Sequence, residues 1–117
     1  MKKILVVDDD EDILHIVSHI LISHGFEVHT HSTGFNVPKI VLDLQPDLIL
    51  LDIRLPGKLG TEICKELKQS YSEIPIILFS AHQQYDVNFL ATFGADAFIK
   101  KPFDIPQFVD TIKSYFK

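Results

Sequence analysis

The chain alternates short strand-like runs with amphipathic segments from one end to the other, and this alternation limits its fold more than any other feature. We predict strands at Lys3–Val7, Glu27–His31, Asp47–Leu51, Ile76–Phe79 and Ala97–Ile99. We predict helices around Ile13–Leu21, with Gly25 as the stop, and at Val37–Leu44, Thr61–Gln69, Gln84–Phe93 and Ile105–Tyr115. Such alternation is typical of a parallel sheet covered by helices on both faces.

The fold class that follows is α/β: an open, doubly wound, five-stranded parallel sheet of the flavodoxin-like kind with five flanking helices. Right-handed crossovers and the strand order 2-1-3-4-5 place the first and third strands side by side. Ligands of such sheets bind beyond the carboxyl ends of the strands, at the switch point between these two strands. On the first helix, the stripe expected to face the core is Ile13, Ile16, Val17, Ile20 and Leu21.

Length and composition describe one globular unit. At 117 residues we predict a single domain, 1–117, and the 46% of hydrophobic residues suffices for a substantial core. The formal net charge is -5 and no Lys/Arg block stands out, which argues against direct nucleic-acid binding. Asp8 ends the first apolar run far too early for a signal peptide or a membrane span, so we expect no membrane insertion and a cytoplasmic location.

Chemically active side chains follow four of the predicted strands. Asp8-Asp9-Asp10 follow the first strand and Asp52 follows the third. Ser80 follows the fourth, and Lys100-Lys101-Pro102 follow the fifth. Because parallel strands end at one edge of the sheet, these groups should meet at one rim. Carboxylates, a hydroxyl and an ammonium can together bind a divalent cation and a phosphoryl group.

The acidic cluster has two interpretations. Asp10 or Glu11 could simply cap the first helix. Asp8 and Asp9 precede the first turn, and facing Asp52 they would repel one another. A hard cation such as Mg2+ resolves that conflict, so we predict that these three carboxylates bind it.

The other rim residues also have ordinary alternatives. Asp52 could be a turn residue, but a carboxylate at a strand end before a Pro/Gly loop is exposed on a stiff support, as a nucleophile must be. Ser80 could be a turn hydroxyl or a donor to phosphoryl oxygens, and Lys101 a surface lysine or a phosphoryl partner. The bond before Pro102 can be cis, which would fix the backbone that aims Lys101.

Histidine and cysteine add no second site. His15 and His19 have a helical spacing that can hold zinc, but they lie opposite the expected apolar stripe with no third ligand nearby. We interpret them as a solvated face. The single cysteine, Cys64, rules out an internal disulfide, and we interpret it as a small apolar residue on the third helix rather than a redox centre.

Taken together and in order, these segments resemble the receiver domain of two-component response regulators over essentially the whole chain. The matching pieces are Ile4–Asp10, Leu50–Gly57 with Gly60, Ser80-Ala81 and Phe98–Phe103. The resemblance implies that Asp52 accepts a phosphoryl group from a histidine kinase or a histidine phosphotransfer protein.

The resemblance also implies roles for the neighbours of Asp52. Asp9, Asp52 and the backbone carbonyl of Arg54 would bind Mg2+ directly, and Asp8 would act mainly through bound water. Lys101 would pair with the phosphoryl oxygens. Ser80 and Phe98 look like the switch pair of the family, which would alter the face formed by the fourth helix, fifth strand and fifth helix. A downstream protein or output domain would read that face, and a phosphorylation-dependent homodimer is a further expectation.

Several positions depart from the commonest pattern of the family. Leu55 stands where Met is frequent, Ser80 where Thr is frequent, and Phe98 where Tyr is frequent. These changes are conservative and keep the chemistry. Arg54 and His82 occupy variable positions that flank the phosphoryl group, so we expect them to tune its lifetime.

A Mg2+-dependent phosphohydrolase with an aspartyl-phosphate intermediate is the alternative from another class. Such enzymes usually place a second acid two residues after the nucleophile, whereas this chain has Arg54 there. We therefore expect a signalling phosphoacceptor that catalyses only its own phosphorylation and dephosphorylation, not an enzyme. A nucleotide or flavin site would need a glycine-rich first loop, and Asp8-Asp9-Asp10-Glu11 is its electrostatic opposite.

Overall fold

A computed structural model describes residues 1–81 and 87–116. It contains a five-stranded parallel sheet in the order β2-β1-β3-β4-β5, as predicted. The strands are β1 Lys3–Val7, β2 Glu27–His31, β3 Leu48–Asp52, β4 Ile76–Ser80 and β5 Ala97–Lys100. β1 and β3 are direct neighbours, with Val7 paired to Leu51, so the switch point lies between them.

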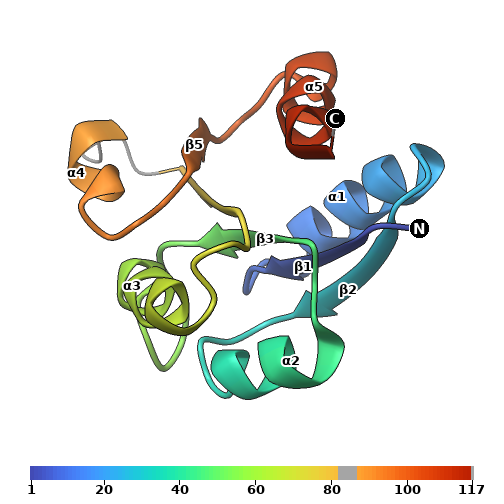
Figure 1. The fold of residues 1–117 in the computed structure, drawn as a ribbon. Helices are drawn as coiled ribbons and strands as arrows, with labels where there is room; N and C mark the ends of the chain where they lie inside the picture. Colours follow the sequence, from blue (N-terminus) through green and yellow to red (C-terminus); the bar gives the residue numbers. More distant parts are fainter. Residues whose placement is uncertain (82–86, 117) are drawn as a thin grey trace.

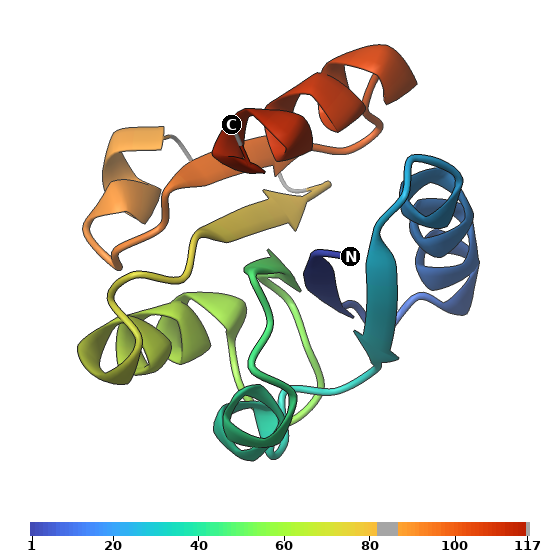
Figure 2. The same cartoon turned by 45° about the vertical axis from the view of Figure 1, so that its right-hand side comes forward.

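Helices cover both faces of the sheet. Their bounds are α1 Glu11–Ser23, α2 Val37–Leu44, α3 Gly60–Ser70, α4 Val87–Ala91 and α5 Ile105–Lys113, followed by the 3-10 turn Ser114–Phe116. Figures 1 and 2 show α1 and α5 on one side of the sheet and α2 and α3 on the other. The fold is therefore the doubly wound α/β sandwich that the strand–helix alternation predicts.

Alternation along the central strands divides the core into two layers. Ile4 and Val6 of β1 point to the layer under α1 and α5, whereas Leu5 and Val7 point to the layer under α2 and α3. Leu90 of α4 packs in that second layer. All five residues of β3 and of β4 are buried, as expected for strands covered on both faces. A rigid support of this kind holds whatever side chains follow the strands.

The structure corrects several details of the predicted elements. β3, β4 and β5 each end one residue later than predicted, at Asp52, Ser80 and Lys100. Ile16 is 51% exposed, and Leu14 takes its place in the core stripe of α1. The last predicted turn of α5 is a 3-10 turn, because the α-helix ends at Lys113. The fourth helix ends at Ala91 rather than Phe93, and its predicted start at Gln84 lies outside the described residues.

Within residues 1–81 and 87–116, no helix has the length and apolar character needed to cross a membrane. Gly25 has a φ of +89° directly after the C-cap of α1, so it ends that helix in the left-handed conformation, as predicted. β2 is an edge strand, and its residues are half-buried or exposed.

Candidate functional site

The candidate site lies at the carboxyl ends of β1, β3, β4 and β5. A cavity of about 270 Å³ opens there, lined by Asp8, Asp9, Asp10, Asp52, Arg54, Ser80, Ala81 and Lys101. Six of the predicted site residues therefore line one space. Phe98, the predicted partner of Ser80 in the switch, does not line it.

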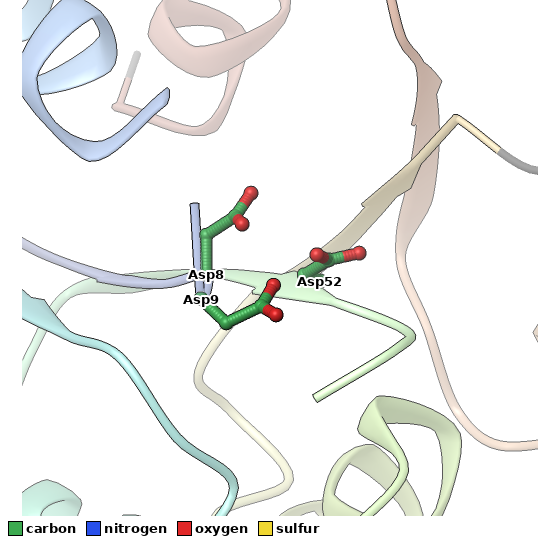
Figure 3. A group of neighbouring side chains, drawn as sticks. All are labelled: Asp8, Asp9 and Asp52. Carbon is green, nitrogen blue, oxygen red and sulfur yellow. The ribbon is translucent and has the colours of Figure 1, made fainter. Parts of the chain in front are cut away.

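Asp8, Asp9 and Asp52 form the acidic side of this cavity. Asp8 follows β1 directly and Asp52 is the last residue of β3, so the paired strands bring them together. Figure 3 shows the three side chains beyond the ends of these strands. Asp8 and Asp52 are buried, at 0% and 7% exposure, and Asp9 is exposed. The expectation of an exposed Asp52 was therefore wrong, because the residue is still part of β3, which is covered on both faces. Buried carboxylates this close to one another need compensating positive charge.

One carboxylate oxygen from each of these aspartates lies within 4.8 Å of the other two. Hard oxygen ligands at this spacing suit a divalent cation that keeps part of its water shell. Asp8 already has donors for both oxygens, since Oδ1 accepts from the amide of Asp10 at 2.9 Å and Oδ2 accepts from Lys101. Asp9 and Asp52 are thus better placed than Asp8 to give an oxygen to a cation directly.

Burial raises the pKa of Asp52 from 3.8 to about 6. The negative charge of Asp8 acts in the same direction, and the ammonium of Lys101 partly opposes both. Without a cation, Asp52 therefore takes up a proton more readily than an ordinary aspartate. A positive ion beside it would favour the charged carboxylate, which is the form that can attack phosphorus.

Lys101 supplies the positive charge of the site. Its Nζ donates to Asp8 Oδ2 at 2.6 Å and lies 3.6 Å from Asp52 Oδ2. The ammonium also lies over the ring of Phe79, 4.5 Å from the centroid. The Lys101–Pro102 bond is cis. Lys100 is exposed, so alternation along β5 separates the two lysines as expected.

Ser80 and Arg54 also line this cavity. Ser80 is fully buried at the end of β4, and its carbonyl accepts from the Lys101 amide at 2.9 Å. Arg54 is exposed, two residues after Asp52. Phe98 is half-buried on β5 and packs against the core layer under α2 and α3. His82, the second residue expected to tune phosphoryl lifetime, lies outside the described residues.

Asp10, His15, His19 and Cys64 lie in ordinary structural environments. Asp10 caps α1, because its side chain accepts from the amides of Asp12 and Ile13. His15 and His19 are exposed, and the only group of three or more potential metal ligands in the described part of the chain is the acidic one. Cys64 is fully buried in the core, and burial raises the pKa of its thiol to about 11.

Two features of the site were not predicted from the sequence. One is the Phe79 ring under the Lys101 ammonium. In the sequence, Phe79 is part of a buried apolar run, and nothing there indicates a contact with Lys101. The other is the contact between the loop after β2 and the loop after β3, in which the Gly34 amide donates to the Pro56 carbonyl at 2.8 Å. Gly34 and Gly57 were the available signal, since glycines often mark close backbone approaches.

Residues 4–113 match the family model described as the response regulator receiver domain. The BeF3-activated N-terminal receiver domain of RstA from Klebsiella pneumoniae has a TM-score of 0.92 and 27% identity, covering 99% of each chain.

Two further solved structures are similar. The response regulator TrrA from Thermotoga maritima, in complex with Mg2+-BeF, has a TM-score of 0.90 and 30% identity, covering 98% of this chain and 99% of that chain. A CheY-like receiver domain protein from Methanospirillum hungatei has a TM-score of 0.88 and 32% identity, covering 97% and 92%. The family match spans nearly the whole chain, and the fold and the strand-end acids agree with it. The chain therefore belongs to the response regulator receiver domain family.

Proposed function

We propose that this receiver domain is the phosphoacceptor of a two-component signalling system and that Asp52 is the residue that is phosphorylated. The observation that carries the proposal is the position of Asp52 at the end of β3, in one cavity with Asp8, Asp9, Ser80 and Lys101. A carboxylate held on a rigid strand beside an ammonium and a second acidic group is suited to phosphoryl transfer. The similar receivers with bound BeF3 or Mg2+-BeF support this assignment.

The acidic side of the cavity fits Mg2+, which Asp9, Asp52 and the backbone carbonyl of Arg54 would hold. When bound, the cation would neutralise the carboxylates and offset charge on the transferred group. In the transfer itself, a carboxylate oxygen of Asp52 attacks the phosphorus of a phosphohistidine in line. The new O–P bond forms as the N–P bond breaks, and the imidazole leaves with the electron pair of that bond.

The other residues of the site would hold the product. The acyl phosphate adds about -1.5 to -2 charges at neutral pH. Lys101 already lies between Asp8 and Asp52, so only a small movement would bring its ammonium to the phosphoryl oxygens. Ser80 lines the same cavity, and its hydroxyl would donate to one of them. Arg54, long and always charged, would cover the group rather than activate water, which favours a persistent signal.

The proposed phosphoryl transfer requires a donor protein and a protein that reads the phosphorylated state. A histidine kinase or histidine phosphotransfer protein would donate the phosphoryl group. Movement of Ser80 and Phe98 would change the face of α4, β5 and α5, which a downstream protein or output domain would read. A phosphorylation-dependent homodimer through that face is also proposed, as is a cytoplasmic setting.

The deciding experiment is labelling by acetyl phosphate in Mg2+. The parent should take up one phosphate per chain, and Asp52→Asn should take up none, because the nearly isosteric amide is not a nucleophile. Asp43→Asn, an exposed acid on α2, is the control and should label like the parent. Undiminished labelling of Asp52→Asn, with the phosphate mapped to another residue, would refute the assignment.

The same preparation tests whether the chain is an enzyme. We propose that it catalyses only its own phosphorylation and dephosphorylation, because an exposed Arg54 occupies the position where a phosphohydrolase needs an acid. With a generic phosphomonoester and Mg2+, the parent should show no sustained turnover. Many turnovers per chain, lost in Asp52→Asn, would instead establish the phosphohydrolase.

A further inference from the structure

The loop after β2, residues 32–36, lies against the loop after β3, residues 53–59, which carries Arg54. The amide of Gly34 donates to the carbonyl of Pro56 at 2.8 Å. A Cβ on Gly34 would lie 2.6 Å from the carbonyl oxygen of Lys58 and 2.9 Å from its nitrogen. The two loops therefore touch backbone to backbone, with no room for a side chain between them.

Phe35 extends this contact from backbone to side chain. A Cβ on Gly57 would lie 2.5 to 2.7 Å from three ring carbons of Phe35, so the ring occupies the space of a side chain at position 57. Gly57 also has a φ of +94°, which L side chains rarely adopt. Phe35 is nevertheless 58% exposed, so the ring covers the second loop from the solvent side rather than filling the core.

Contacts of its own hold Phe35 in place. Its amide donates to Thr33 Oγ1 at 3.1 Å, and its carbonyl oxygen accepts from the Nε2 of His31, 2.8 Å away. His31 ends β2, and its backbone carbonyl accepts from the amide of Asp8 at 3.1 Å. One short segment thus connects Asp8, directly after β1, with the loop that follows Asp52 of β3.

The loop it covers is unevenly supported. Ile53 and Leu55 are buried, so the packing of their side chains in the core holds the residues on either side of Arg54. Pro56, Gly57 and Leu59 are exposed, and Gly60 fixes the far end of the loop through a 2.7 Å bond from its amide to the Ile53 carbonyl. The middle of the loop has the contacts with Gly34 and Phe35, and an ion pair of Lys58 with Glu66 on α3 at 3.0 Å.

We infer that Phe35 is a positioning residue for cation binding, acting through Gly57 on the loop that carries the Arg54 carbonyl. The inference rests on the proposed function, since it assumes that Asp9, Asp52 and that carbonyl bind Mg2+. Removing the ring would leave the ligands present but the loop freer, so each binding event would have to order it. The cost should appear in Mg2+ affinity more than in the stability of the metal-free protein.

The test is a Mg2+ titration in which the NMR chemical shifts of the Asp9 and Asp52 backbone amides report binding. Phe35→Ala should weaken Mg2+ binding by about threefold to tenfold, less than the tenfold to hundredfold typical of groups bonded directly to a ligand. Phe35→Tyr keeps the ring and should bind like the parent. Leu42→Ala is the matched control, because Leu42 is 60% exposed on α2 and belongs to neither loop.

A pairwise test with Gly57 separates this contact from a general loss of structure. Gly57→Ala should weaken Mg2+ binding more in the parent than in Phe35→Ala, where the ring that collides with the new Cβ is gone. Equal effects in both backgrounds, or a Phe35→Ala affinity equal to that of Leu42→Ala, would overturn the inference while leaving the proposed function intact. A parent that binds no Mg2+ would instead contradict the proposed metal site itself.

Discussion

Asp52 combines burial, a carboxylate neighbour and an ammonium neighbour, and the balance among them is unfavourable for its charged form. Desolvation and Asp8 raise its pKa to about 6, and Lys101, 3.6 Å away, offsets only part of this effect. Lys101 is closer to Asp8, at 2.6 Å, which satisfies the more deeply buried carboxylate first. In the metal-free protein, the charged carboxylate of Asp52 therefore lowers the free energy of unfolding.

This destabilisation predicts a pH-dependent gain in stability for Asp52→Asn. Between pH 3.8 and about 6 the folded protein holds a proton on Asp52 that the unfolded chain has lost, so stability falls as the pH rises through this window. In EDTA at pH 7, Asp52→Asn should be more stable than the parent by on the order of 1–3 kcal/mol. Urea unfolding at a series of pH values measures the difference, which should shrink toward pH 4.

The control for this prediction is Asp43→Asn, because Asp43 is exposed on α2. The free energy of unfolding of Asp43→Asn should differ little from that of the parent at every pH. A difference between parent and Asp52→Asn that stays constant from pH 4 to 7 would show that burial does not disfavour the Asp52 carboxylate.

Mg2+ should stabilise the parent and not Asp9→Ala. The cation relieves repulsion among three carboxylates whose oxygens lie within 4.8 Å of one another. Binding to the folded state alone adds roughly 2.7 kcal/mol at a hundredfold excess over the dissociation constant. Asp9 is exposed, so its truncation should leave the metal-free thermal midpoint nearly unchanged. A parent midpoint that does not respond to Mg2+ would contradict the metal site.

At the level of single residues, the sequence predicted which side chains share the site, but not which of them form hydrogen bonds or ion pairs with one another. Asp8, Asp52, Ser80 and Lys101 share one cavity because each follows a strand of a parallel sheet, and strand ends can be recognised in a sequence. The Lys101–Asp8 bond joins groups 93 residues apart through a long, flexible side chain. Such a pairing depends on the path of that side chain, which periodicity does not describe.

At the level of elements, predictions succeeded where one pattern dominated. β1, β2 and α2 have the predicted bounds, and each has an Asp, Gly or Pro within two residues of one end: Asp8 after β1, Gly25 before β2 and Pro46 after α2. α1 was misjudged on one position, since Leu14 and Ile16 both lie near the edge of its apolar stripe and only packing decides between them. The contact between the loops after β2 and β3 depends on two irregular segments, for which no period exists.

The cap of α1 gives a prediction at this level. Asp10 accepts from the amides of Asp12 and Ile13, so Asp10→Ala leaves two helix-end donors without this partner. The loss should be about 0.5–2 kcal/mol of unfolding free energy. Denaturant unfolding in EDTA measures it, and labelling of Asp52 should persist. Asp104→Ala at α5, where the side chain accepts from one amide only, should cost less. An Asp10→Ala protein as stable as the parent would refute the capping role.

At the scale of the whole molecule, the site and the face that would carry the signal are joined through β4 and β5. The Ser80 carbonyl accepts from the Lys101 amide, and Ser80 pairs with Lys100 in the sheet. Phe98 lies two residues before that pair, half-buried against the core layer that includes Leu90 of α4. A movement of Lys101 toward a phosphoryl group would therefore displace β5, the strand that carries Phe98.

Lys101→Ala should consequently separate phosphorylation from its readout. Asp52 remains, so acetyl phosphate should still label it, though more slowly because an ammonium that balances the transferred charge is missing. With Mg2+ present, the amide shifts that beryllofluoride causes around Ser80 and Phe98 should shrink, since the ammonium that would link the phosphoryl group to the residue after β5 is gone. Lys100→Ala is the control, because that lysine is exposed one residue earlier and should keep the parental shifts. The full parental shift pattern in Lys101→Ala would show that the ammonium does not transmit the signal, and that β4 carries it through Ser80 alone.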